Sequence, residues 1–345
     1  MKRVLCIIAA LFVALAPASC SSNIDKSDYK IAVAAYAEDE LSKQFALGII
    51  DEAERLGYDE IEFIENTDDE ISRWAGHNSP ENAYICILSR DPSVLGMCEE
   101  LKPKGFNVTV AFDDMLLYHE DFPAALKDDE VSPAIDCLLP YDEAALYGDI
   151  AAELKELLDG KSGRMIILPG RTSGALYDAN YYEKCIKMAL ERENCDISRV
   201  QITSLVITNT DDGLIWTPVQ DESANAPTDL KEIQSDTIAT LSLSTDAAEF
   251  AARNFPERYN AAFIGLSETS TQLYESGAID SLYCYPMYEL GAKAVLHIDN
   301  LIEKKHETKV EYVPADKFDA QSGGKMLLER CNDDSLFSKY NYFTN

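Results

Sequence analysis

Residues 261–302 read AAFIGLSETSTQLYESGAIDSLYCYPMYELGAKAVLHIDNLI, and this stretch of the 345-residue chain decides the fold. The apolar run 261–266 predicts a buried strand, and a short polar helix follows it up to Gly277. A second short apolar run reaches Cys284, and an amphipathic helix follows Pro286. A strand, a helix, a strand and a helix in immediate succession are typical of a parallel α/β sheet.

The same alternation runs through the rest of the chain. In the first half we expect strands at 31–35, 61–64, 84–88 and 108–112, with helices at 40–56 and 92–101. The pattern restarts at 137–140, and strands are expected at 165–168, 200–207 and 236–243, with helices at 143–158, 181–191 and 245–254. Asp212-Gly213 predicts a β-hairpin turn. Two α/β lobes are favoured, and one continuous doubly wound sheet is the alternative.

The 261–302 stretch also resembles the closing segment of type I periplasmic binding proteins, the sugar-binding subunits of ABC importers. The matching motifs are Gly265-Leu266, Ser276-Gly277-Ala278-Ile279-Asp280 and Tyr288-Glu289-Leu290-Gly291. Earlier fragments at 52–58, 148–154 and 166–170 follow in the family's order. The resemblance covers about residues 29–320, and it implies an α/β fold of two doubly wound parallel-sheet lobes joined by a three-crossing hinge.

The layout of the N-terminus and the resemblance together predict a division of the chain. We expect a signal peptide (1–19), a linker (20–28), an N-terminal lobe (29–139) and a C-terminal lobe (140–285). A return to the N-terminal lobe (286–306), a return to the C-terminal lobe (307–320) and a tail (321–345) would follow. The three crossings are expected near residues 139–141, 284–286 and 307–310. No role is predicted for the tail.

The N-terminus has the layout of an export signal. Met1-Lys2-Arg3 is basic, and the apolar run 4–16 is too short to span a bilayer. Ala18-Ser19-Cys20 resembles a bacterial lipobox, although Pro17 departs from its usual leucine. This predicts lipid attachment at Cys20 and an extracytoplasmic protein anchored to the bacterial cell membrane, periplasmic or on the cell surface. The alternative is an ordinary secretory signal cleaved near Ala18.

Composition and charge exclude several classes of function. Apolar residues make up 46% of the chain, an ordinary proportion for a globular protein. Sixty-one acidic residues against 30 basic ones give a net charge of −31. Because such a surface repels phosphate, we expect no nucleic-acid partner.

The sequence contains no recognisable metal-binding or catalytic motif. No Cys or His spacing suggests a metal site or a cofactor, and seven cysteines remain outside the signal and anchor. We expect free buried thiols, with a Cys185–Cys195 disulfide as the alternative. The four histidines form no HExxH motif, and Thr269 occupies the second glycine position of a nucleophile elbow. We therefore expect no enzymatic activity.

The resemblance also places candidate ligand-binding residues. Tyr182, Ser267 and Tyr285 stand where the family has arginine, aspartate and glutamine, and Ser242 or Ser244 replaces an asparagine. Fewer charged anchors favour a less polar or cationic ligand, held by tyrosine faces and carboxylates. The predicted ligand-binding residues are Tyr36, Glu38, Arg90, Asp113, Tyr182, Ser244, Ser267 and Tyr285.

The resemblance thus implies a solute-binding protein that captures a small molecule, a sugar or another small polar or cationic solute, between its lobes. It would deliver this solute to an ABC-type membrane permease. One alternative is a ligand-sensing module for a membrane receptor kinase. The other is a surface lipoprotein that keeps the fold without binding a ligand.

Overall fold

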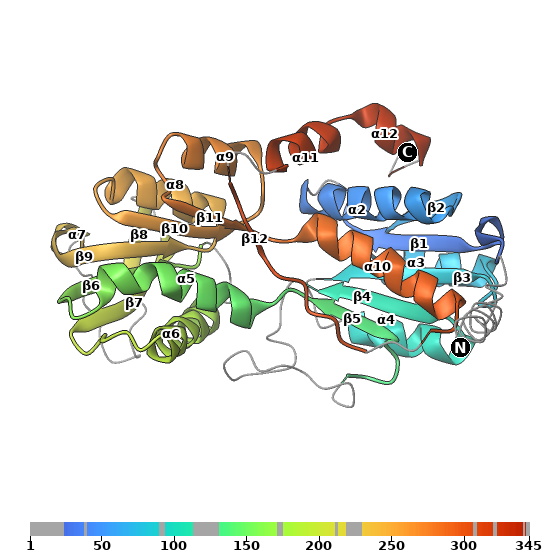
Figure 1. Cartoon of the computed structure of the whole chain (residues 1–345), viewed down its shortest axis with the longest axis horizontal. Helices are drawn as coiled ribbons and strands as arrows, with labels where there is room; N and C mark the ends of the chain where they lie inside the picture. The colour runs from blue at the N-terminus through green and yellow to red at the C-terminus, as the bar shows by residue number, and fades with distance from the viewer. Residues whose placement is uncertain are drawn as a thin grey trace, which may run out of the picture.

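The computed structural model describes residues 24–37, 40–89, 94–112, 131–170, 175–210, 213–218, 230–305, 309–319, 323–340 and 342. These residues form two α/β lobes, and the chain crosses between them near the middle of the molecule (Figure 1). Each lobe has its own sheet. The prediction of two lobes is therefore confirmed, and the alternative of one continuous sheet is wrong.

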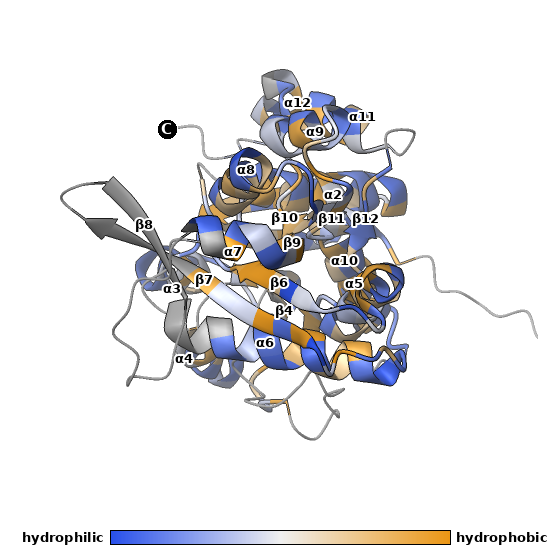
Figure 2. Cartoon of the chain, turned by 90° about the vertical axis from the view of Figure 1, so that its left-hand side faces the viewer, coloured by the Kyte–Doolittle hydropathy of each residue, from blue (hydrophilic) through white to orange (hydrophobic). Residues whose placement is uncertain are grey.

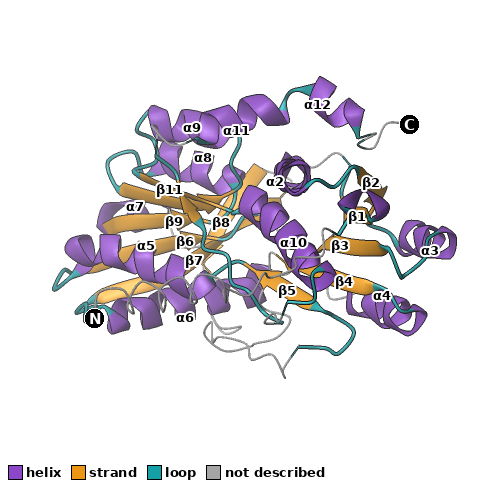
Figure 3. Ribbon diagram, turned by 45° about the vertical axis from the view of Figure 1, so that its right-hand side comes forward, coloured by secondary structure: helices purple, strands orange, loops and turns teal. Residues whose placement is uncertain are grey.

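The N-terminal lobe has a five-stranded parallel sheet in the order β2-β1-β3-β4-β5. Its strands are β1 (Lys30–Ala35), β2 (Glu60–Glu65), β3 (Ala83–Ser89), β4 (Asn107–Phe112) and β5 (Cys137–Pro140). Helices α2 (Glu40–Leu56) and α10 (Met287–Ile302) cover one face of the sheet, and α3 (Asp68–His77) and α4 (Val94–Leu101) cover the other (Figure 3). A helix from late in the chain thus completes the first lobe.

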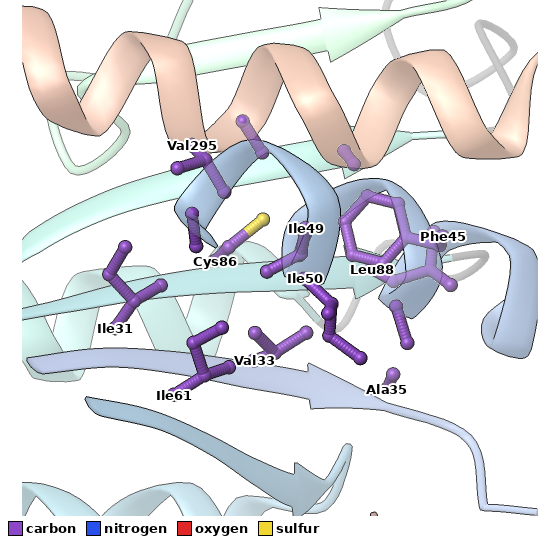
Figure 4. Packing of buried hydrophobic residues seen from close by; sticks show 14 of the residues in the cluster. Ile31, Val33, Ala35, Phe45, Ile49, Ile50, Ile61, Cys86, Leu88 and Val295 are labelled. Carbon is purple, nitrogen blue, oxygen red and sulfur yellow. The ribbon is translucent and has the colours of Figure 1, made fainter. Parts of the chain in front are cut away.

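The central strands of this lobe are buried on both faces. All of β3 is buried, and so is β1 beyond its first residue. Figure 4 shows Ile31 and Val33 of β1 packed with Ile49 of α2, and Val295 of α10 closes the same cluster. This explains why the strands read as continuous apolar runs rather than as alternating patterns.

The C-terminal lobe has a seven-stranded sheet in the order β12-β11-β10-β9-β6-β7-β8. Its strands are β6 (Gly163–Leu168), β7 (Val200–Thr210), β8 (Gly213–Pro218), β9 (Thr237–Ser242), β10 (Tyr259–Ile264), β11 (Ser281–Cys284) and β12 (Asp316–Lys317). The two edge strands are antiparallel to their neighbours and the others are parallel. The predicted hairpin is confirmed, because Thr210 of β7 pairs with Gly213 of β8.

Helices cover both faces of this second sheet. Helices α5 (Glu143–Leu158) and α6 (Ala175–Arg192) lie on one face (Figure 2). On the other face lie α7 (Leu230–Asp236), α8 (Thr245–Asn254) and α9 (Glu268–Glu275). The architecture is the predicted pair of doubly wound lobes.

Three segments cross between the lobes. The first follows β5 at Tyr141, and the second runs through Tyr285 and Pro286 between β11 and α10. The third crossing lies later than predicted. Val310 still pairs with Leu138, so the chain leaves the N-terminal lobe after Val313 instead of at 307–310. Val310 and Val313 pair with Leu138 and Tyr141 of the first crossing. Because of this pairing, the chain enters the C-terminal lobe only after Val313.

The tail makes a fourth connection that was not expected. Helices α11 (Gly324–Cys331) and α12 (Asp334–Lys339) run from α9 of the C-terminal lobe to α2 of the N-terminal lobe (Figures 1 and 3). Leu328 is buried in the C-terminal lobe core, whereas Cys331 is buried in the N-terminal one. We call residues 323–342 the C-terminal strap.

Ion pairs fasten the C-terminal strap at both ends. Lys325 pairs with Glu275 of α9. Arg330 donates to both carboxylate oxygens of Asp51 on α2 at 2.6 Å each, and the Tyr288 hydroxyl of α10 donates to the same carboxylate at 2.7 Å. Although burial raises the pKa of Asp51, these donors lower it overall, so the carboxylate stays charged.

Several other expectations concern the ends and the thiols. Residues 1–23, with the signal and Cys20, lie outside the described residues; in the predicted linker, Lys26 pairs with Asp299 of α10. All seven described cysteines are buried and free, so the Cys185–Cys195 disulfide does not form. No helix in the described ranges is long and apolar enough to cross a membrane.

Two glycines let α2 and α10 touch backbone to backbone. A Cβ on Gly48 of α2 would overlap the carbonyl oxygen of Tyr288, and a Cβ on Gly291 of α10 would overlap that of Phe45. Any larger side chain must therefore push the helices apart. Gly291 belongs to the Tyr288-Glu289-Leu290-Gly291 motif, so the motif has a packing role.

We predict that Gly291→Ala destabilises the protein by about 3 kcal/mol or more, because overpacking forces a backbone shift. Urea unfolding measures the change. Gly148→Ala is the matched control, since nothing lies within 4 Å of its added Cβ in α5. The control should gain stability from its helix propensity. Equal stability of wild type and Gly291→Ala would contradict the close approach.

Candidate functional site

The carboxyl ends of the strands in each lobe form the edge at which ligands of open α/β sheets bind. At the N-terminal lobe's edge, Tyr36 follows β1 and Asn66 follows β2. The Asn66 amide donates to the Tyr36 hydroxyl at 3.2 Å and to the Leu88 carbonyl oxygen at 2.8 Å. The amide thereby fixes the predicted ligand residue Tyr36 at this edge.

Each edge carries one buried polar atom that lacks a hydrogen-bond partner in the described part of the chain. The atoms are Oδ1 of Asn66 and Oγ of Ser242, the last residue of β9. An unsatisfied buried polar group costs about 1–3 kcal/mol, so it calls for an explanation. A bound solute that supplies hydrogen bonds is one. Sequence reasoning did not select Asn66, and it offered Ser242 only as the alternative to Ser244.

Two predicted ligand residues have a structural task. The Ser244 hydroxyl accepts the N–H of Ala247 at 3.2 Å and caps α8. The Ser267 hydroxyl accepts the N–H of Ser270 at 3.1 Å within the capping box of α9. Both serines lie at the expected edge, but their oxygen atoms already serve the helix ends.

Tyr182 and Tyr285 belong to one tyrosine cluster at the first and second crossings. Its centre is Glu143, 3% exposed, whose carboxylate accepts hydrogen bonds from the hydroxyls of Tyr141 at 2.8 Å and Tyr181 at 2.7 Å. The Tyr181 ring meets Tyr182 edge-on at 5.7 Å, and the Tyr141 ring meets Tyr285 at 5.8 Å. One carboxylate therefore positions both predicted tyrosines through their neighbours.

The electrostatics of the cluster keep its hydroxyls protonated. Burial, and then the charge of Glu143, raise the pKa of Tyr141 and of Tyr181 well above the ordinary value. Both tyrosines therefore donate to Glu143 at any physiological pH. The cluster is a fixed aromatic wall rather than a proton relay.

A cavity of about 690 Å³, the hinge pocket, lies between the second and third crossings and the C-terminal strap. Tyr285 lines it, together with Gln44 of α2 and Leu266 at the end of β10; Tyr182 does not. The buried Gln44 side chain donates to the Leu266 carbonyl oxygen at 2.7 Å. The two lobes thus touch directly beside this pocket.

The remaining candidates are Glu38, Arg90 and Asp113, and they lie outside the described residues. Among the residues that the structure does describe, no group of three or more His, Cys, Asp or Glu side chains could hold a metal ion.

We predict that Glu143→Gln destabilises the protein by about 2–4 kcal/mol, because two hydrogen bonds to a buried charged acceptor are weakened. Urea unfolding of the variant measures the loss. Glu156→Gln, an exposed change on the same helix, is the control and should leave stability within about 0.5 kcal/mol of wild type. A Glu143→Gln variant as stable as the control would show that the carboxylate does not support the tyrosine cluster.

No family model matches the chain, and no curated protein matches it. Solved structures do. A periplasmic ribose ABC transporter from Conexibacter woesei is 14% identical, with a TM-score of 0.62 over 90% of this chain and 99% of that one. GanP, a glucose-galactose binding protein from Geobacillus stearothermophilus, is 15% identical, with a TM-score of 0.56 over 85% and 98%.

A third similar structure, from Brachyspira murdochii, is described as an ABC transporter, LacI family transcriptional regulator. It is 13% identical, with a TM-score of 0.55 over 90% of this chain and 98% of that one. These identities establish a common fold rather than a common ligand. The two lobes, their sheet orders and their crossings thus give this chain the fold of the type I periplasmic binding proteins.

Proposed function

We propose that this protein is an extracytoplasmic solute-binding protein, lipid-anchored at Cys20, which captures a small molecule between its lobes and delivers it to an ABC-type permease. The observation that carries the proposal is the pair of lobes whose sheet edges both carry polar side chains. Asn66 Oδ1 at one edge and Ser242 Oγ at the other are buried atoms without a hydrogen-bond partner in the described part of the chain. A solute that bridges the lobes would satisfy both and favour one lobe arrangement.

The chemistry of the edges narrows the ligand to a small polar or cationic solute, sugars included. Asn66 and Ser242 offer hydrogen bonds, and Tyr36 and Tyr182 offer aromatic faces. The predicted Glu38, Arg90 and Asp113 would add charge. With Ser244 and Ser267 engaged as helix caps, we assign the larger share of polar recognition to Asn66 and Ser242.

A thermal-shift screen of sugars, nucleosides, amines and amino acids tests solute binding. A ligand of the native state raises the melting temperature in a saturable way. For such a solute we predict that Asn66→Ala weakens binding about tenfold or more in calorimetry, as the loss of about 1.4 kcal/mol requires.

Asn78→Ala is the matched control for that variant. The Asn78 amide also donates to a backbone carbonyl, that of Trp74 at 2.9 Å, but it lies at the C-terminal end of α3, away from the edge. The Asn78→Ala variant should bind the solute with the affinity of the wild-type protein. Failure of every solute to raise the melting temperature, or undiminished binding by Asn66→Ala, would refute solute capture at the edges.

Lipid anchoring has its own test. In the native host, we predict that wild type fractionates with membranes and that Cys20→Ala moves to the soluble fraction, because attached acyl chains supply stable anchoring. Fractionation with immunoblotting measures this. Membrane retention of Cys20→Ala would contradict lipid attachment at that residue.

A further inference from the structure

The hinge pocket has apolar walls that the proposed solute site does not use. Leu266 and Phe318 come from the C-terminal lobe, Met287 from the start of α10, and Met326 and Leu327 from the C-terminal strap. Met326 is 64% exposed, and only Leu296, at 37%, is another exposed large hydrophobic among the described residues. A cavity of this size and character suits a small organic molecule.

The cations at the pocket are already neutralised. Lys293 pairs with Glu311, Lys317 with Glu153, and Arg330 with Asp51. Arg330 and Asp51, for example, lie 2.6 Å apart. The positive charge that lines the pocket is therefore not available to an anionic ligand.

The two carboxylates that line the pocket, in contrast, have no basic partner among the described residues. Glu289 and Asp316 line it, and within the described part of the chain neither forms an ion pair. Both side chains are partly open to solvent. The partial desolvation of Asp316 and, after it, the charge of Glu289 raise the pKa of the Asp316 carboxyl. A cation beside Asp316 would stabilise its charged carboxylate.

We propose that the hinge pocket is a second ligand site, which binds a lipophilic ammonium ion. The carboxylates of Glu289 and Asp316 receive the ammonium group, and the ring of Tyr285 adds a cation–π face. Leu266, Phe318 and the flexible Met326 enclose the apolar part of the ligand. A sugar would leave its hydroxyls against these apolar walls, and an anion would meet uncompensated negative charge.

The position of the pocket gives such a ligand an influence on the hinge. Gln44 belongs to the N-terminal lobe, Phe318 to the C-terminal lobe, and Leu327 to the C-terminal strap that packs on both cores. A bound molecule contacts all three parts. It therefore stabilises the lobe arrangement in which the pocket is formed.

Calorimetry with two probes of similar size and opposite charge tests the site. We expect 2-phenylethylamine to bind the full-length protein saturably and 3-phenylpropionate not to bind. The double variant Glu289→Gln/Asp316→Asn should bind the amine at least tenfold more weakly. The control Glu99→Gln/Asp69→Asn removes two exposed acids elsewhere and should bind it like wild type.

A second variant guards against misfolding of the first. Met326→Lys places a cation at an exposed position of the pocket wall. It should weaken amine binding and leave the melting temperature unchanged. The control Met326→Leu should bind the amine like wild type. Binding of both probes alike, or of neither, would overturn the proposal.

The edge variant separates this site from the proposed solute site. Asn66→Ala should leave amine affinity unchanged if the amine occupies the hinge pocket. Amine binding that is lost in Asn66→Ala and kept in Glu289→Gln/Asp316→Asn would overturn the second site and leave solute capture at the sheet edges standing. If Asn66→Ala loses binding of the edge solute but keeps amine binding, the two sites are separate and both proposals stand.

Discussion

The contact between α2 and α10 through Gly48 and Gly291 is the constraint on which the rest of the structure depends. Helix α10 directly follows the second crossing. Its packing against α2 therefore fixes the position of Tyr285 and Pro286, through which the chain leaves the C-terminal lobe. A close-packed interface has few alternative arrangements, and small displacements there carry large costs. The hinge pocket and the tyrosine cluster are both built outward from this fixed contact.

Asp51 extends the same contact to the C-terminal strap. Tyr288 of α10 and Arg330 of α11 both donate to its carboxylate, so three helices meet at one charge. The strap then reaches the C-terminal lobe through Leu328 and Lys325. Because the C-terminal strap adds a fourth connection to the three crossings, it restricts the relative motion of the lobes. The hydrogen bond from the Gln44 side chain to the Leu266 carbonyl oxygen also joins the lobes directly.

The two lobes could be predicted because buried parallel strands are continuous apolar runs, and 31–35 and 84–88 stand out from their polar surroundings. The strap could not. Its helices are short, and Arg330 meets Asp51 across 279 residues, a contact with no local signature. The third crossing was placed too early because the polar residues near 307 hide the apolar pair Val310 and Val313 that keeps the chain beside β5.

The candidate site was less predictable than the fold. Ser244 and Ser267 lie at the expected edge, yet each precedes a helix, and a serine at that position is a capping signal in its own right. Asn66 and Glu143 were missed because their importance comes from burial. Asn66 reads as a loop residue after a strand, and Glu143 reads as an ordinary acid in a first helical turn.

The central claim is that a small molecule held between the lobes biases their arrangement. Pulsed electron resonance between spin labels at Glu81→Cys and Glu257→Cys, exposed sites on opposite lobes, measures it directly, because all seven described native thiols are buried. With a solute that raises the melting temperature, the inter-lobe distance distribution should narrow and shift to a single population. A distribution unchanged at saturating solute would contradict the account.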